Sequence, residues 1–246
     1  MTNSAEIFEN EPGASFAALP AAFDAVLFDF DGVIVESTQI KTDAFRELFA
    51  EFPRYVDQIV ELHERNAGVS RLIKFDMIYR DILRLPLSDA DRRSLAHRFQ
   101  RLVLEKVIAC PMVPGVLDLL WFLSRRISFA VVSGTPEDEL RQIIAKRDLA
   151  AYFVAVNGSP RTKADIISAL LHERRWPPDR VLMIGDAIED FKAASATAIR
   201  FVGRVMQGRA NPFPVGTVVV EDMMHLTAAI VLPGCFDATS AKNSVA

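Results

Sequence analysis

The feature that most constrains this chain is an apolar run, Ala25 to Phe28, followed at once by two acidic residues, Asp29 and Asp31. A run rich in Val, Leu and Phe is typical of a strand buried on both faces of a parallel sheet. In open α/β sheets, ligands bind outside the carboxyl ends of such strands, where the loops reach solvent. The stretch therefore predicts a central strand with a ligand site at its end.

Asp29 and Asp31 are two positions apart, so strand alternation sends both side chains to the same side. Two close carboxylates repel unless a cation or a shared proton relieves them. Mg²⁺ is a hard ion that takes one or two carboxylates together with phosphate oxygens. Gly32 allows a turn that a residue with a Cβ resists. We therefore expect a divalent metal here; a metal-free acidic turn after the strand is the alternative.

Length, net charge, apolar content and cysteine content argue against several classes of partner. With 246 residues, the chain can form one large domain or two modest ones. Its formal net charge of -4 argues against nucleic acid as a main partner. We find no apolar stretch of membrane-spanning length and no signal-peptide pattern at the acidic N-terminus. Cys110 and Cys235 are far apart and are expected to be reduced thiols. We therefore expect a cytoplasmic protein, a monomer or weak dimer, with no nucleic-acid or membrane partner.

A helical pattern follows the first strand. From Ser37, apolar residues recur at intervals of three and four, and further helices are expected over 55–65, 71–85 and 89–108. No strand pattern occurs in this part of the sequence. The block 37–110 is of small-domain size and predicts an inserted helical domain.

Strands and helices alternate in the second half of the chain. We expect strands over 127–132, 152–156, 181–184, 199–202 and 217–220, and helices over 116–125, 163–173 and 190–196. Alternation of this kind indicates an α/β fold with a mainly parallel, Rossmann-like sheet and helices on both faces. The core would comprise 23–36 and 111–233. Residues 1–22 are expected to be a disordered lead-in and residues 234–246 a flexible tail.

Polar residues follow four of the apolar segments, where the chain approaches one edge of the sheet. They are Asp29 with Asp31, Ser133 with Thr135, Lys163, and Asp186 with Asp190. Because parallel strands end on the same edge, these side chains are expected to converge. Together they supply what phosphoryl transfer requires: a nucleophile, a metal site, donors for phosphate oxygens and a fixed cation.

These residues also carry a family resemblance. In chain order, Asp29 to Val33, Val131 to Gly134, Lys163, and Gly185 to Asp190 resemble the four motifs of haloacid dehalogenase-like (HAD) superfamily hydrolases. All four in the right order and on the right predicted elements are a far stronger signal than any one of them. The likeness extends from Phe23 to about Leu232.

The resemblance implies a role for each acidic residue. Asp29 would attack phosphorus and become an aspartyl phosphate, while Asp31 would protonate the leaving oxygen and later activate water. Mg²⁺ would be held by the Asp29 carboxylate, the Asp31 main-chain carbonyl and Asp186. Asp190 would support this site from behind, through water or by orienting Lys163.

The resemblance also implies how phosphate is bound. Ser133 and the Gly134 amide would bind phosphate oxygens, and Lys163 would neutralise their charge. Many relatives place proline directly after this lysine, whereas here alanine follows. An exposed helical lysine is the alternative for this position, and Lys146 and Lys192 are competitors for the role.

The helical insertion resembles the cap of subfamily I members, which closes over the site and selects the substrate. Asn66 to Arg71 looks like the cap loop of β-phosphoglucomutase-like members, in which the arginine faces a distal anionic group. Ser70 and Arg71 are therefore expected to bind substrate. A glycine-mediated helix break with Ser70 as N-cap explains the same residues. Neighbouring residues that could shape specificity, or could simply belong to an exposed helix, are His63, Glu64, Arg65 and Lys74.

The expected function is a Mg²⁺-dependent phosphatase acting on a small phosphorylated metabolite, such as a sugar phosphate or a phosphoglycolate-like compound. Asp31 argues against a dehalogenase, which does not need that acid. A sugar phosphomutase of the β-phosphoglucomutase type is the alternative, favoured by Arg71. A non-catalytic binding protein is a third possibility, and it is disfavoured because an abandoned site has no physical reason to retain buried like charges.

Overall fold

The computed structural model describes residues 23–224 and 226. The expected lead-in (1–22), the expected tail (234–246) and Cys235 lie outside these residues. Within the described part of the chain, no helix combines the length and the apolar character that crossing a membrane requires.

The core of the fold is a six-stranded sheet in which all neighbouring strands run parallel, in the order β3-β2-β1-β4-β5-β6. In the register, Phe28 at the end of β1 lies between Val131 of β2 and Ile184 of β4. The segments that follow these strands therefore meet at one edge, as expected. The strands are β1 (Ala25–Phe28), β2 (Ser128–Pro136), β3 (Ala155–Ser159), β4 (Val181–Gly185), β5 (Arg200–Arg204) and β6 (Val219–Val220).

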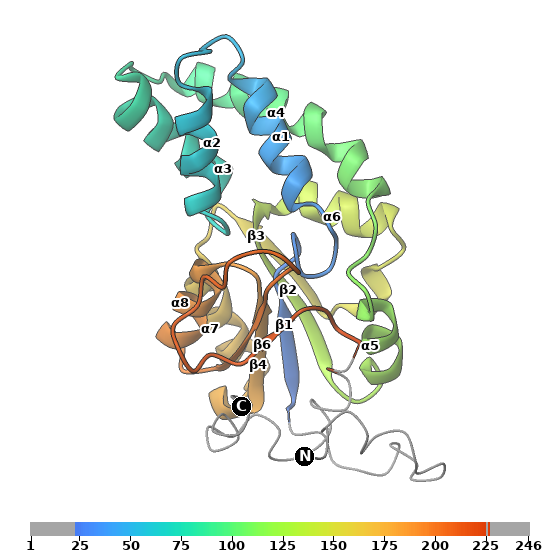
Figure 1. The fold of residues 1–246 in the computed structure, drawn as a ribbon. Coiled ribbons are helices and arrows are strands. Elements are labelled where there is room, and N and C mark those ends of the chain that lie inside the picture. Colours follow the sequence, from blue (N-terminus) through green and yellow to red (C-terminus); the bar gives the residue numbers. More distant parts are fainter. Residues whose placement is uncertain (1–22, 225, 227–246) are drawn as a thin grey trace.

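Helices cover both faces of this sheet (Figure 1). On one face, Val26 and Phe28 of β1 share a core with helices α5 (Val116–Leu123) and α6 (Glu137–Lys146). On the other face, Ala25 and Leu27 share a core with α7 (Lys163–Arg174) and α8 (Ile188–Ala196). Alternate residues of one fully buried strand thus serve two cores, which is why β1 is apolar throughout. The predicted α/β class is confirmed.

A helical insertion separates β1 from β2 and stands over the carboxyl edge of the sheet (Figure 1). It contains an aromatic cluster, in which the rings of Phe45 and Phe99 lie 4.9 Å apart. Residues 37–110 contain no strand, as the sequence predicts. The proposed boundaries of this cap, 37–110, stay a prediction. Its helices are α1 (Thr38–Leu48), α2 (Val56–Arg65), α3 (Arg71–Met77), the π-helix η3 (Ile78–Leu83) and α4 (Asp89–Ala109).

Two expected strands differ most from the structure. The predicted strand over 152–156 begins only at Ala155, because Ala150–Tyr152 forms a 3₁₀ turn, η4. Strand β2 does not stop at Val132 but continues to Pro136, which pairs with Ser159 of β3 after a shift in register. The apolar pattern does end at Val132. Pairing is a backbone property, however, and it continues through the polar residues that follow.

The two segments that join cap and core are hydrogen-bonded to each other. The Glu36 amide donates to the Pro111 carbonyl at 2.9 Å, and the Val113 amide donates to the Ile34 carbonyl at 3.0 Å. Arg147, just after α6, bonds the last turn of α4 by donating to the carbonyls of Val107, Ile108 and Cys110. The two connecting segments are therefore hydrogen-bonded to each other, and Arg147 of the core stabilises the end of α4 beside them.

Candidate active site

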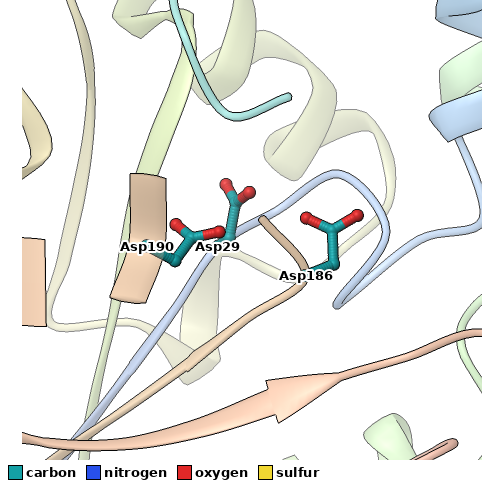
Figure 2. A group of neighbouring side chains, drawn as sticks. All are labelled: Asp29, Asp186 and Asp190. Atoms are coloured by element: carbon teal, nitrogen blue, oxygen red, sulfur yellow. The ribbon is translucent and has the colours of Figure 1, made fainter. Parts of the chain in front are cut away.

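Three carboxylates meet at the carboxyl edge of the sheet: Asp29 after β1, Asp186 after β4 and Asp190 in the first turn of α8. They form a carboxylate cluster in which one oxygen from each lies within 4.8 Å of the others (Figure 2). Gly32 makes room for it, because a Cβ there would lie 2.1 Å from Asp186 Oδ2. Gly32 also has φ of +73°, which confirms the expected turn.

Lys163 provides the fixed cation of this cluster. Its Nζ lies 3.0 Å from Asp29 Oδ2 and also donates to Asp190 Oδ1. Burial lowers the pKa of Lys163, but the charges of Asp190 and Asp29 outweigh it, so the pKa stays above its usual value. The alternative of an exposed helical lysine is wrong, because the residue is only 8% exposed. Lys146 and Lys192 are exposed and pair with other carboxylates, Glu105 and Glu189.

The cluster carries more negative than positive charge. Burial, and then the charges of Asp29 and Asp190, raise the pKa of Asp186 well above its usual value. Asp190 is already engaged: its Oδ2 accepts from the Ala187 amide at 3.0 Å while Oδ1 accepts from Lys163. The carboxylate oxygens of Asp29 and Asp186 suit a hard divalent cation, which would relieve this repulsion. The donor set thus fits a metal ion.

Asp186→Asn is expected to separate stability from metal binding. Removing one of three crowded carboxylates should raise the melting temperature in chelator by about 2–4 °C, the shift that roughly 1 kcal/mol gives in a chain of this size. The same change should abolish the stabilisation that Mg²⁺ gives the unsubstituted protein. Thermal unfolding with Mg²⁺ and with chelator measures both.

Asp57→Asn is the matched control for that experiment, because its side chain is 94% exposed and its ion pair with Arg46 is an exposed one that contributes little to stability. It should leave both melting temperatures unchanged. A lower melting temperature of the Asp186 variant in chelator would instead mean that Asp186 stabilises the fold, contrary to the metal interpretation.

Asp31 lies outside the carboxylate cluster and has neutral and cationic partners. Its carboxylate accepts from Ser37 Oγ at 2.6 Å and Thr135 Oγ1 at 2.8 Å, and pairs with Lys41. Burial raises the pKa of Asp31, but Lys41 and these hydrogen bonds outweigh it, so the net pKa is below its usual value. The two aspartates of the first motif therefore occupy different electrostatic environments, which is what distinct chemical roles require.

Lys41 is a site residue that the sequence analysis missed. Its Nζ bonds both Asp31 and, at 2.7 Å, Thr135 Oγ1. A signal was present: Lys41, Phe45 and Leu48 have the spacing i, i+4, i+7, so a lysine occupies the apolar stripe of α1. A charged residue on a buried stripe indicates a buried partner.

Ser133 and Gly134 line the cavity at the end of β2, as expected. Ser133 is 1% exposed and its Oγ accepts from the Thr135 amide at 3.2 Å. A Cβ on Gly134 would lie 2.5 Å from the carbonyl oxygen of Gly68 in the cap loop. The cap loop is therefore packed directly against the strand end where phosphate is expected to bind.

The cap residues Ser70 and Arg71 are placed differently from what the resemblance suggests. Arg71 lies at the cavity, but its two terminal nitrogens bond Glu139 of α6 at 3.0 and 2.5 Å, and both side chains are buried. Ser70 precedes α3 but its side chain makes no capping hydrogen bond. Its buried Oγ has no hydrogen-bond partner among the described residues. Arg71 is thus neutralised by the core, whereas Ser70 occupies the expected N-cap position of α3 without the capping side-chain hydrogen bond.

Cap and core enclose one cavity of about 460 Å³ over the carboxylate cluster. Residues from both sides line it, among them Asp29, Ser133, Phe45, His63, Lys74 and Phe99. His63 and Lys74 are buried, at 7% and 4% exposed, so the alternative of an exposed helix surface is wrong for these two. Glu64 and Arg65 are exposed and also line the cavity.

The sequence profile of the haloacid dehalogenase-like hydrolases matches residues 26–204, which include all four motifs. The chain belongs to this family. Its curated relatives include the protein CbbY of Cereibacter sphaeroides, which is 27% identical over 202 residues that span 73% of this chain and 83% of the relative. Phosphoglycolate phosphatase 1 of Pseudomonas aeruginosa is 25% identical over 224 residues, 85% of this chain and 82% of the relative.

Solved structures share the haloacid dehalogenase-like fold. CbbY from Rhodobacter sphaeroides, in complex with xylulose-1,5-bisphosphate, superimposes with a TM-score of 0.69 at 18% identity, over 85% of this chain and 100% of that one. β-Phosphoglucomutase from Clostridium difficile gives a TM-score of 0.67 at 17% identity, over 83% and 93%. At these identities the likeness concerns the fold.

Proposed function

We propose that the protein is a Mg²⁺-dependent phosphatase that hydrolyses a small phosphorylated metabolite through an aspartyl phosphate on Asp29. The observation that carries this proposal is that two neighbouring aspartates have different surroundings. Asp29 lies in the carboxylate cluster beside Lys163, whereas Asp31 is held apart by hydroxyl groups and Lys41. One is placed to attack phosphorus and the other to transfer protons.

In the first step, an Asp29 oxygen bonds to phosphorus as the bond from phosphorus to the leaving oxygen breaks. Asp31 donates a proton to the leaving oxygen. Ser133 and the Gly134 amide bind the phosphate oxygens, and Lys163 offsets their charge. In the second step, Asp31 takes a proton from water, whose oxygen displaces Asp29 and forms inorganic phosphate.

The low pKa of Asp31 in the free protein favours the second of these roles, activation of water. The first role requires that Asp31 be protonated once substrate is bound. The Asp29 carboxylate, the Asp31 main-chain carbonyl and Asp186 would hold Mg²⁺, which would supply positive charge beside the nucleophile and the phosphate.

Named relatives support the substrate class. Besides the phosphoglycolate phosphatases, they include a phosphorylated carbohydrates phosphatase of Thermotoga maritima, 24% identical over 184 residues. We accordingly propose a sugar phosphate or a phosphoglycolate-like compound as substrate, and a cytoplasmic monomer or weak dimer as the working form.

The sugar phosphomutase alternative has less support from the site. Arg71 is the residue that favours it, and its charge is neutralised by Glu139. A non-catalytic binding protein is disfavoured by the intact cluster of Asp29, Asp186 and Asp190 with its lysine.

Phosphate release from a panel of phosphorylated metabolites, with Mg²⁺ and with chelator, tests the proposal. We expect release from at least one small phosphate monoester, and its loss in chelator. An isomeric sugar phosphate formed without inorganic phosphate would overturn the phosphatase in favour of the mutase. Absence of both reactions, together with absence of Mg²⁺ binding by calorimetry, would favour a binding protein.

A further inference from the structure

Lys74 of α3 is a buried cation without an acidic partner among the described residues. Its Nζ contacts His63 Nδ1 at 3.0 Å and donates to the His63 carbonyl at 3.1 Å. It also lies 5.7 Å from the centroid of the Phe45 ring. Lys41 and Arg71, which line the same cavity, and Lys163 of the carboxylate cluster differ from it, because each pairs with a carboxylate.

His63 cannot neutralise Lys74. Burial first, and then the charge of Lys74, lower the pKa of His63 to about 2, so the ring is neutral and its Nδ1 accepts from the lysine. An ammonium group has three N–H donors. His63 takes two of them with its Nδ1 and its carbonyl oxygen, which leaves one donor for another group and, when the amine is protonated, a positive charge that no described carboxylate balances.

The unfavourable surroundings of the Lys74 ammonium group lower its pKa. Burial, and then the charge of Lys41, lower the pKa of Lys74 to about 7. Buried charges in proteins are generally paired, since desolvation without a partner is expensive. A ligand that brings a negative charge would supply the missing partner.

The position of Lys74 indicates which ligand that is. Lys74 and His63 line the same cavity as Asp29 and Ser133, on the cap side of it. The rings of Phe45 and Phe99 also line this cavity, and apolar walls strengthen the attraction between opposite charges. A substrate whose phosphate lies at Asp29 can therefore place a second group near Lys74.

We propose that Lys74 binds a second anionic group of the substrate, a carboxylate or a second phosphate. The protein would then prefer phosphate monoesters that carry such a group over monoesters of neutral polyols. This inference rests on the proposed phosphatase function. It assigns cap-side anion recognition to Lys74 in place of Arg71, whose charge is already balanced by Glu139.

The test compares kcat/KM for 2-phosphoglycolate, a sugar bisphosphate and glycerol 3-phosphate. Lys74→Met should lower kcat/KM for the preferred doubly anionic compound by about 10- to 100-fold, mainly through KM, since a charged hydrogen bond is lost. Glycerol 3-phosphate should change less than about threefold. The compound with the larger loss shows whether the second group is a carboxylate or a phosphate.

Lys106→Met is the matched control, because it removes the same charge from an exposed position on α4 of the cap. It should leave all three values unchanged. Lys74→Arg, which keeps the cation, should retain more of the preference than Lys74→Met. If Lys74→Met does not fold, Lys74→Gln takes its place in the comparison.

The outcomes separate this inference from the function on which it rests. Equal losses on all three compounds, or no loss, in a folded Lys74 variant would overturn the subsite while leaving the phosphatase intact. No phosphate release by the unsubstituted protein would overturn the phosphatase. In that case, calorimetry measures the affinity of the unsubstituted protein and of Lys74→Met for 2-phosphoglycolate. Equal affinities would overturn the assignment of the anion subsite to Lys74.

Discussion

Replacing Asp29 with asparagine should abolish phosphate release, with a loss of about 10⁴-fold or more, because the nucleophile that forms the covalent intermediate is gone. The fold should survive. Asparagine has the same shape, and its Oδ1 can still accept from the Phe30 amide, which donates to Asp29 at 2.7 Å. Lys163 keeps Asp190 as a partner. Single-turnover and steady-state phosphate assays measure the loss.

Thermal unfolding is the companion measurement for Asp29→Asn. Removing one charge relieves repulsion in the carboxylate cluster, so the melting temperature in chelator should stay level or rise. Asp57→Asn again serves as the exposed control. Turnover within tenfold of the original would point to another nucleophile, and a large fall in melting temperature would mean that Asp29 is structural.

Asp31→Asn should lower the rate by about two to four orders of magnitude, the usual contribution of a general acid-base group. Asparagine can preserve hydrogen bonds to Ser37 and Thr135 but cannot transfer a proton. Lys41 keeps Thr135 Oγ1 as an acceptor at 2.7 Å. Binding of Mg²⁺ and of inorganic phosphate, measured by calorimetry, should therefore survive while kcat falls.

Asp43→Asn is the control for Asp31→Asn, because Asp43 lies on the exposed side of α1 and bonds only Gln39 in the described contacts. It should behave like the original protein. Loss of metal and phosphate binding in the Asp31 variant would show that its side chain builds the site instead of transferring protons.

The sequence could predict the cluster of Asp29, Asp186 and Lys163 because local rules place each residue at a strand end or a helix start. Parallel pairing of β1 with β2 and β4 then brings those ends to one edge. No such rule governs contacts between cap and core. The pairing of Arg71 with Glu139 joins residues 68 positions apart and depends on how the cap is seated.

Lys41 and Lys74 illustrate the same limit. Both occupy the apolar side of a cap helix, a pattern that indicates burial, yet their partners come from elsewhere in the chain. The sequence shows that such a lysine needs an acceptor or an anion. Only the arrangement of helices shows that Lys41 meets Asp31 while Lys74 meets no carboxylate among the described residues.

The hydrogen bonds of Asp31 couple its chemistry to the position of the cap. Two of its partners, Ser37 and Lys41, lie at the start of the inserted helices, whereas the third, Thr135, lies on β2 of the core. If the cap moves away, the aspartate loses part of this set. Water that reaches an uncovered site then meets an Asp31 without its full set of partners, so in the proposed mechanism the movement that admits solvent also weakens the group that activates water.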